Sequence, residues 1–207
     1  HRLHLAVHRG VDVLALAEGE TGTATEAGVA DLTFVGLVGM SDPPAEGVRE
    51  TIDRFRTAGI RTLMITGDQR ATAAAVAHEL GIGEEGDEVL DGGELRNLAP
   101  AEMAERLPHV AALSRVTPED KLRIIEALQQ RGEIVAMLGD GVNDAAALKK
   151  SNIGVAMGTR GTDVAKESAA IVLQDDRFQT IGAAVEEGRV IFDNIRKFVF
   201  YLFSCNL

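Results

Sequence analysis

The sequence predicts an α/β fold in which a mainly parallel sheet is flanked by helices. Short apolar runs alternate with helical segments along most of the chain, which is typical of βαβ units. Several apolar runs end in polar residues next to glycine, and open α/β sheets bind ligands at the carboxyl ends of their strands. A hydrophobic content of 45% over 207 residues suits one such domain, or one domain and part of another.

The composition argues against some classes of partner. The formal charge is −11, from 32 acidic and 21 basic side chains. We therefore expect no nucleic-acid partner, because phosphate backbones are bound by basic surfaces. The single cysteine, Cys205, excludes an internal disulfide and fits a reducing compartment. The chain begins at His1 and ends on an apolar run over residues 198–205, far short of the roughly 20 residues of a spanning helix. We expect an internal piece of a longer protein.

The amino-terminal part of the chain predicts two strands and a domain boundary. Residues 11–17 alternate well enough for a strand. Residues 18–28 contain three glycines and little to bury, so we expect an exposed loop there. The boundary is expected near Ala30. Residues 32–40 form a second apolar run and predict a buried strand, which the two following prolines end by fixing φ and removing two N–H donors.

The remaining elements alternate between strands and helices. Gly59 and Gly81 close two helices. Thr117 and Pro118 mark the start of a third, as N-cap and first helical residue. We expect strands over residues 62–65, 110–113, 134–138, 153–157 and 171–173. We expect helices over residues 45–58, 70–80, 93–98, 101–107, 118–131, 145–149 and 163–168, and a long one from Phe178 onward.

Phosphate-binding chemistry is predicted at two places. Thr66, Gly67 and Asp68 directly follow the strand over residues 62–65. A hydroxyl with close backbone N–H groups at a helix N-terminus suits phosphate oxygens. Lys121 lies in the first turn of its helix, where the helix dipole disfavours a cation, and this indicates an anionic partner.

A third place predicts a metal site. Asp140, Asn143 and Asp144 lie in a glycine-containing turn between the apolar run 134–138 and an alanine-rich helix. Their oxygens are hard donors of the kind that Mg²⁺ binds while it keeps several waters. Mg²⁺, a lysine and backbone donors around one phosphoryl group are components of phosphoryl transfer. Each motif alone also fits a plain turn, a surface lysine or a helix cap, but their succession, each after its own apolar run, favours a functional site.

These motifs resemble those of the haloacid dehalogenase superfamily and, more narrowly, the phosphorylation domain of P-type ATPases, which implies a Rossmann-like sheet. The similarity covers about residues 31–207 and rests on residues 65–68, Lys121 and residues 139–148. Residues 38–44 and 154–158 agree with that family, and residues 175–198 favour its type II branch of calcium, sodium/potassium and related pumps.

The resemblance implies a role for each candidate residue. Catalytic roles fall to Thr66, Lys121 and Asp140. ATP or its phosphates would be bound by Thr66, Gly67, Asp68, Arg115, Lys121 and Asn143, with Arg115 reaching toward the nucleotide. Asp140 would bind the catalytic Mg²⁺, with Asp144 a second ligand or lying next to the ion. Asp42 would belong to the hinge between domains.

The resemblance also implies a domain organisation. Residues 1–30 would be the tail of a nucleotide-binding domain, 31–190 the phosphorylation domain, and 191–207 a stalk helix and the start of a transmembrane helix. The parent protein would be a multi-pass membrane pump with this segment on the cytoplasmic side. Its cofactors would be Mg²⁺ and ATP, and the partners of this segment would be the nucleotide-binding, actuator and transmembrane domains. The transported ion cannot be identified, because its ligands would lie in membrane helices.

One motif of that family is absent. The motif Asp-Lys-Thr-Gly-Thr, which carries the phosphorylated aspartate in that family, does not occur in the chain. Residues 21–23 read Thr-Gly-Thr, but Gly19 occupies the position that the aspartate of the motif would take. The family places the nucleophile upstream, on a strand central to the sheet. Without that strand, either the sheet has a gap or the strands over 62–65 and 134–138 close up on each other.

Three functions therefore compete. The first is a truncated phosphorylation domain of a cation pump that has no ATPase activity alone. The second is a soluble Mg²⁺-dependent phosphatase of the same superfamily, which needs its own nucleophilic aspartate. The third is a non-catalytic module that binds Mg²⁺ or a nucleotide.

Overall fold

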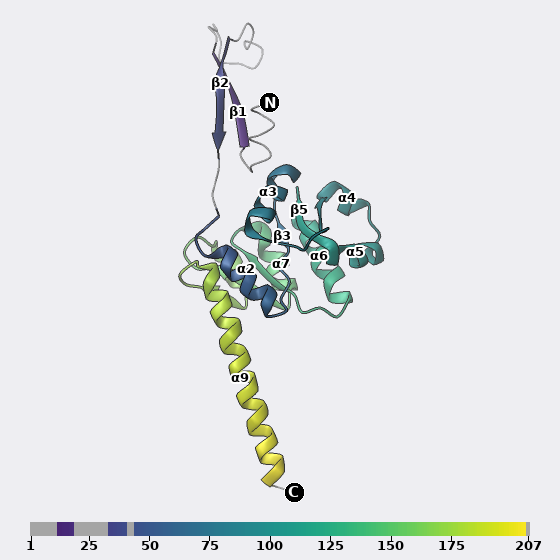
Figure 1. The fold of residues 1–207 in the computed structure, drawn as a ribbon, viewed down its shortest axis with the longest axis vertical. Coiled ribbons are helices and arrows are strands. Elements are labelled where there is room, and N and C mark those ends of the chain that lie inside the picture. Colours follow the sequence, from purple (N-terminus) through teal and green to yellow (C-terminus); the bar gives the residue numbers. More distant parts are fainter. Residues whose placement is uncertain (1–11, 19–32, 41–43, 206–207) are drawn as a thin grey trace.

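Two three-stranded parallel sheets and their helices form the main body, from which a hairpin and a long helix project in opposite directions (Figure 1). The structure is a computed structural model that describes residues 12–18, 33–40 and 44–205. The mainly parallel α/β class that the alternation of elements predicts is confirmed.

The first sheet has the order β3-β5-β4 and the second the order β6-β7-β8. The strands of the first are β3 (Met64–Ile65), β5 (Val110–Ser114) and β4 (Glu88–Asp91). Those of the second are β6 (Ala136–Gly139), β7 (Ile153–Met157) and β8 (Ile171–Leu173). β7 and β8 have the predicted bounds. The central strand β5 is buried along its whole length, as parallel strands covered on both faces are.

Eight α-helices, counted over the described residues, connect or follow these strands. They are α2 (Val48–Thr57), α3 (Arg70–Leu80), α4 (Gly92–Asn97), α5 (Pro100–Arg106), α6 (Pro118–Gln130), α7 (Ala145–Lys150), α8 (Asp163–Ser168) and α9 (Phe178–Cys205). The bounds of α3 and α8 are those predicted. α2 begins three residues later than expected, because Gly47 at its N-cap takes a left-handed φ of 75°. The capping box of α6 forms as predicted, with the Thr117 side chain accepting the Asp120 N–H.

Within the parallel sheets, sequence reasoning missed one strand and misplaced the start of another. β4 was not predicted, because its ends are polar, yet Leu90 within it is completely buried. The buried strand expected over 134–138 starts only at Ala136, and the Ile134 side chain is 76% exposed. In both cases local hydrophobicity is a poor guide, because pairing with a neighbouring strand decides where a strand begins and ends.

The hairpin consists of β1 (Asp12–Glu18) and β2 (Thr33–Met40), which pair antiparallel. The run over 32–40 does form a strand, but the expectation that it is buried is wrong. Large apolar side chains of both strands, such as Leu14 and Phe34, are exposed. Among the described residues, β2 pairs only with β1 and joins neither parallel sheet. The predicted boundary near Ala30 lies outside the described residues.

β3 and β6 end their respective sheets and do not pair with each other among the described residues. Of the two arrangements expected from the sequence, backbone pairing of these two strands is therefore absent from the described residues, and the unpaired edges of β3 and β6 are called the gap below. Helix α6 spans both sides of it: Ile124 packs in a core cluster with strands of the first sheet, and Ile125 packs with Met137 of β6 in another. Packing through α6 thus joins two sheets that share no backbone ladder.

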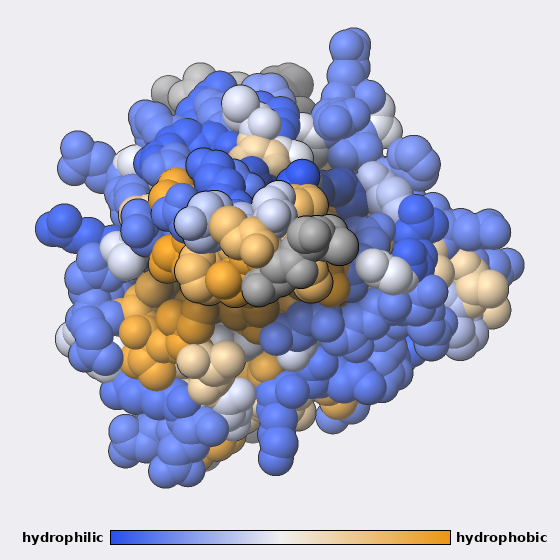
Figure 2. Space-filling model, turned by 90° about the horizontal axis from the view of Figure 1, so that it is seen from below, coloured by the Kyte–Doolittle hydropathy of each residue, from blue (hydrophilic) through white to orange (hydrophobic). Residues whose placement is uncertain are grey.

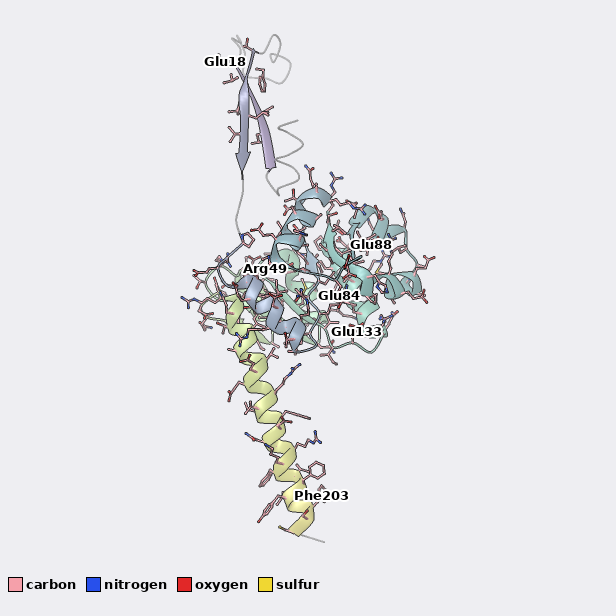
Figure 3. All side chains as sticks on the ribbon, in the orientation of Figure 1. Glu18, Arg49, Glu84, Glu88, Glu133 and Phe203 are labelled. Carbon is pink, nitrogen blue, oxygen red and sulfur yellow. The ribbon has the colours of Figure 1, made fainter. Side chains whose placement is uncertain are left out.

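Helix α9 docks on α2 through its first half only. Phe178 meets Phe55 edge to face at 5.6 Å between ring centroids, and Arg189 donates to the Ala58 carbonyl at 2.8 Å. Beyond this contact the helix runs free of the body, with Phe203 near its far end and 67% exposed (Figure 3). Seen from the side toward which α9 projects, apolar residues gather at the centre of the visible surface (Figure 2). Within the described ranges, no helix combines the length and apolar character that crossing a bilayer requires.

Candidate functional site

The candidate site is organised by an ion pair between two of the predicted residues. The Lys121 ammonium lies 2.5 Å from Oδ1 of Asp144, joining the first turn of α6 to the turn after β6. Both side chains are largely buried, at 19% and 11% exposed. Buried charges are stable when paired and hydrogen-bonded, so this pair holds α6 and the β6 turn in a fixed relation across the gap.

The other oxygen of Asp144 holds the turn itself. Oδ2 accepts the N–H of Asp140 at 3.3 Å and that of Gly141 at 3.1 Å. Glycine is needed at position 139, because a Cβ there would lie 2.5 Å from the Asp144 Cβ. The backbone that follows the strand therefore turns around the Asp144 carboxylate, which binds two of its N–H groups at the point where the chain enters α7.

Asp140 and Asn143 lie on the open side of this turn. Both are exposed, and neither side chain takes part in a hydrogen bond or ion pair within the described part of the chain. The main chain of Asp140, by contrast, is fixed, because its carbonyl accepts the Thr162 N–H from the start of α8 at 2.9 Å. An immobilised backbone thus presents a carboxylate and an amide whose oxygens remain available to a ligand.

The turn after β3 is the second part of the site. The Thr66 hydroxyl donates to Oδ2 of Asp68 at 2.8 Å and accepts the Asp68 N–H at 3.1 Å. Gly67 between them is exposed, and a Cβ there would meet nothing within 4 Å. The predicted phosphate-binding hydroxyl is therefore held by its own neighbour, and a bound anion would compete with the Asp68 carboxylate for it.

The segment after β5 connects this turn to the ion pair. Arg115 donates its N–H to the Asp68 carbonyl at 3.1 Å, and Val116 donates to the Thr66 carbonyl at 3.2 Å. Arg115 has a left-handed φ of 51° and an exposed side chain. The segment then enters α6, whose first turn carries Lys121. All these residues follow the carboxyl ends of parallel strands or begin the next helix, as the sheet-edge prediction requires.

The structure thus brings the predicted residues together to different degrees. Lys121, Asp144 and the Asp140 backbone are in direct contact, whereas in the described residues no hydrogen bond joins Thr66 or Asp68 to any of them. Asp42, the predicted hinge residue, lies outside the described residues.

Two functional candidates escaped sequence reasoning. Thr162 contributes a backbone group only, which leaves no signal in the side-chain pattern. Asp176 binds three backbone N–H groups, and the adjacent acidic pair at 175 and 176 was the visible signal.

The oxygen ligands of the turn after β6 suit a magnesium ion whose binding also requires a second molecule. The described residues contain no cluster of three or more His, Cys, Asp or Glu side chains that could hold a metal alone. Asp140 and Asn143 offer free oxygens, and Asp144 lies beside them. Mg²⁺ usually takes one or two carboxylates, several waters and phosphate oxygens of a substrate, so these residues fit an ion that binds together with a phosphate.

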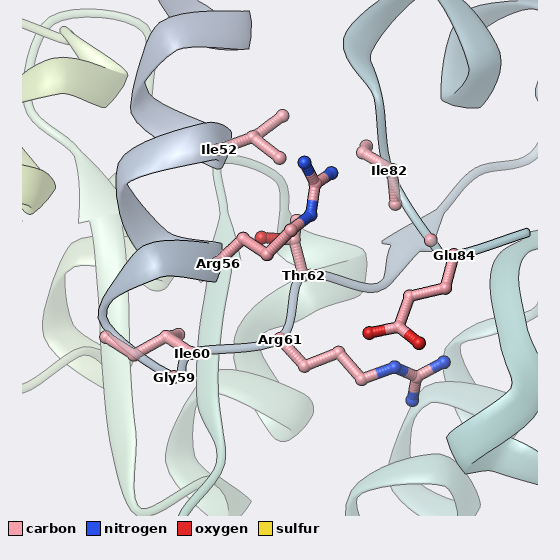
Figure 4. Close-up of a pocket in the computed structure, with 9 residues that line it drawn as sticks. Ile52, Arg56, Gly59, Ile60, Arg61, Thr62, Ile82 and Glu84 are labelled. Carbon is pink, nitrogen blue, oxygen red and sulfur yellow. The ribbon is translucent and has the colours of Figure 1, made fainter.

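One cavity of the described body lies away from this site. It encloses about 210 Å³ and is lined by the segment over 59–62, which precedes β3, and by residues of α2 and the loop after α3 (Figure 4). Its two arginines are already bound, Arg56 to the Gly81 carbonyl and Arg61 to the carbonyls of Leu107 and Val110. The cavity is at the amino end of β3, away from Thr66, and takes no part in the candidate site.

Comparison with known proteins identifies the family of the chain. The family model described as haloacid dehalogenase-like hydrolase matches residues 7–152. A second model with the same description matches residues 121–184. Together the two matches include the turns after β3 and β6 and the start of α6.

The similar curated proteins are ion pumps. The chain is 52% identical over 176 residues to "Calcium-transporting ATPase 1" of Bacillus cereus, covering 85% of this chain and 20% of that protein. It is 44% identical over 198 residues to human "Calcium-transporting ATPase type 2C member 1", covering 96% and 21%. A "P-type sodium-transporting ATPase4" of Toxoplasma gondii is 50% identical, covering 86% and 14%. The chain thus spans about a fifth or less of the length of these relatives.

Proposed function

Because this chain belongs to the haloacid dehalogenase-like hydrolases, we propose that it is the phosphorylation domain of a P-type cation pump and supplies the loops that bind Mg²⁺ and the phosphoryl group. The relatives named above, all similar over most of this chain, support that assignment. The single observation that carries it is the ion pair of Lys121 with Asp144, because the same Asp144 carboxylate that binds this cation also accepts the backbone N–H of Asp140.

Each residue of the site has a chemical part in this proposal. Asp140 binds Mg²⁺ directly, since its carboxylate is exposed and unpaired within the described part of the chain, while Asp144 is occupied in orienting the turn and Lys121. Thr66, Gly67 and Asn143 bind oxygens of the phosphoryl group, and Lys121 neutralises its charge. Bound Mg²⁺ would supply further neutralisation of phosphate charge. Arg115, exposed beside the Thr66 turn, contacts the nucleotide.

The acceptor aspartate is proposed to come from a strand elsewhere in the parent protein. β3 and β6 each have a free ladder edge among the described residues, and their polar turns flank the gap between them. A strand inserted there would place a carboxylate at its carboxyl end between Thr66 and Asp140. Its oxygen attacks the γ-phosphorus of ATP and ADP leaves; water then cleaves the acyl phosphate. The covalent intermediate divides one difficult transfer into two easier ones.

The parent protein is proposed to be a multi-pass membrane pump with this domain on its cytoplasmic side. The exposed apolar half of α9 supports a continuation into a membrane segment. The nucleotide-binding, actuator and transmembrane domains are its partners, and residues 191–207 form the stalk helix and the start of a transmembrane helix. The relatives' names include both calcium and sodium, so the proposal specifies a cation and not its identity.

The test separates this proposal from its two alternatives. The purified 207-residue chain is incubated with Mg²⁺ and either ATP or a panel of phosphate esters, and the parent pump is assayed for an acid-stable phosphoenzyme from labelled ATP. The proposal expects no turnover by the chain and a labelled pump. Turnover of phosphate esters by the chain would instead identify a phosphatase. Micromolar binding of ATP to the chain in calorimetry, with no label in the parent protein, would identify a non-catalytic module.

A further inference from the structure

The loop between β7 and α8 is held by a carboxylate that has no part in the function proposed above. Backbone N–H groups of Gly158 and Thr159 donate to Oδ1 of Asp176 at 2.6 and 2.9 Å, and the Arg160 N–H donates to Oδ2 at 2.8 Å. The Asp176 side chain is only 11% exposed, and the Arg160 guanidinium lies 3.5 Å from Oδ2. One side chain that follows the turn after β8 thus accepts hydrogen bonds from three consecutive N–H groups of a different loop.

The same loop carries the group that fixes Asp140. After Gly161 the chain reaches Thr162, whose N–H donates to the Asp140 carbonyl and whose hydroxyl caps α8 by accepting the Ala165 N–H. Gly161 packs closely against the end of β7, because a Cβ at this position would lie 2.0 Å from the Met157 carbonyl oxygen. The residues bound by Asp176 are thus separated from Thr162 by Gly161 alone, and Thr162 in turn binds the Asp140 backbone.

The backbone conformation of Asp176 indicates that the carboxylate is the reason for an aspartate at this position. Its φ is 52°, in the left-handed region that asparagine and aspartate tolerate better than most residues and glycine best of all. Glycine would relieve the backbone but would remove the acceptor. The three N–H groups, that of Thr159 foremost, hold the pKa of the Asp176 carboxyl below its ordinary value, so the group is charged at neutral pH. A charged acceptor forms stronger hydrogen bonds than a neutral one.

We propose that Asp176 is a positioning residue for the magnesium site, acting through residues 158–162 on the backbone of Asp140. Residues that orient a metal ligand typically change metal affinity 10- to 100-fold when they are removed. The consequence for Mg²⁺ rests on the function proposed above, whereas the effect on the loop does not.

The variants are chosen so that only the acceptor changes. Asp176→Gly and Asp176→Asn both tolerate the left-handed backbone. The glycine variant removes all three hydrogen bonds, while the asparagine variant keeps an oxygen for Gly158 and Thr159 and loses the one to Arg160. Asp175→Ala is the matched control, because Asp175 accepts from Thr180 and from the Arg177 N–H at the start of α9 and does not bind this loop.

The first measurement is amide hydrogen exchange of Thr162, read by NMR on the 207-residue chain. We expect it to be about 10-fold faster in Asp176→Gly, about 3-fold faster in Asp176→Asn, and unchanged in Asp175→Ala. Unchanged exchange of Thr162 in Asp176→Gly would overturn the proposal, whatever the parent pump does. If Asp176→Gly does not fold, the asparagine variant decides alone, and unchanged exchange there overturns the proposal equally.

The second measurement uses the parent pump and the Mg²⁺ concentration that half-saturates phosphoenzyme formation from ATP. We expect that concentration to rise about 10-fold in Asp176→Gly and about 3-fold in Asp176→Asn, with the half-saturating ATP concentration unchanged. A general loss of stability would alter the amount of phosphoenzyme without this selective shift. Equal Mg²⁺ dependence in all variants would overturn the positioning role, while an unlabelled wild-type pump would overturn the proposed function instead.

Discussion

Lys121 and Asp144 meet at 2.5 Å and thereby join the first turn of α6 to the turn after β6. The pair has two consequences. It satisfies a carboxylate that is largely buried, and it links the ammonium group, through Asp144, to the backbone of the exposed Asp140. An anion that binds at this edge would find a cation whose position is fixed before it arrives, which is the preorganisation on which electrostatic catalysis depends.

Removing the ammonium should destabilise the chain. In Lys121→Met the Asp144 carboxylate keeps two backbone N–H groups but loses its ion pair, so we expect the free energy of unfolding to fall by about 2 kcal/mol, somewhat less than for a fully buried pair. Urea denaturation measures it. Lys150→Met is the matched control, because Lys150 pairs with Glu126 at 3.0 Å on an exposed surface, where a pair contributes at most about 1 kcal/mol. Equal losses in both variants would contradict the structural role of Lys121.

Replacing each glycine of the turn by alanine should lower the unfolding free energy more at Gly139 than at Gly141. In Gly139→Ala the new Cβ would lie 2.5 Å from the Asp144 Cβ, and we expect a loss of about 1–3 kcal/mol in unfolding free energy from overpacking. In Gly141→Ala the nearest atom, Oδ2 of Asp144, would be 3.5 Å away, which is an ordinary contact, so we expect less than about 0.5 kcal/mol. Urea denaturation of the two variants compares them directly. A reversed order would mean that the turn is built differently.

Acid should weaken the first sheet through Glu88. Arg106 binds both carboxylate oxygens, Nε to Oε1 at 2.5 Å and a terminal nitrogen to Oε2 at 2.8 Å. This hydrogen bonding lowers the pKa of Glu88 from its ordinary value of 4.5. Because the folded-state pKa is the lower one, the pair stabilises the fold fully above the ordinary pKa, and this contribution is lost as the pH falls through the lowered value.

The corresponding variant is Glu88→Gln, followed by urea denaturation between about pH 3 and pH 7. We expect the stability difference between wild type and variant to be largest near neutrality and to shrink below about pH 4.5. Glu133→Gln serves as control, because Glu133 makes one exposed contact with Arg131 at 3.2 Å and should have little effect at any pH. A difference that grows on acidification would contradict the sign.

The fold was predictable wherever local pattern and tertiary context agree. β7 and α8 have the predicted bounds, since an apolar run and a threonine N-cap define them without help from distant residues. β4 escaped prediction because polar Glu88 and Asp91 bound it, and only Arg106, from a later helix, explains why Glu88 is stable there. Ile134 is apolar yet exposed, and its apolar character alone did not reveal that the strand begins only at Ala136.

The site was predictable by residue type more than by contact. The sequence indicated Lys121 and Asp144 separately, but their pairing depends on how α6 crosses between the two sheets. Thr66 was predicted to offer its hydroxyl to phosphate, whereas its bond with Asp68 depends on the rotamers of both side chains. The role of Asp176 depends on three backbone N–H groups whose convergence only a folded loop can create.

The central claim is that Asp140 serves the phosphoryl-transfer site and not the fold. Its side chain is exposed and makes no hydrogen bond within the described residues, so Asp140→Asn should leave the unfolding free energy of the chain within about 0.5 kcal/mol of wild type. Asp53→Asn, which removes an exposed carboxylate on α2, is the matched control.

The most direct measurement is the phosphoenzyme formed from labelled ATP by the parent pump carrying Asp140→Asn. The account predicts no detectable phosphoenzyme in this variant and wild-type labelling in Asp53→Asn. Labelling of the Asp140→Asn pump at the wild-type level and at the same Mg²⁺ concentration would contradict it.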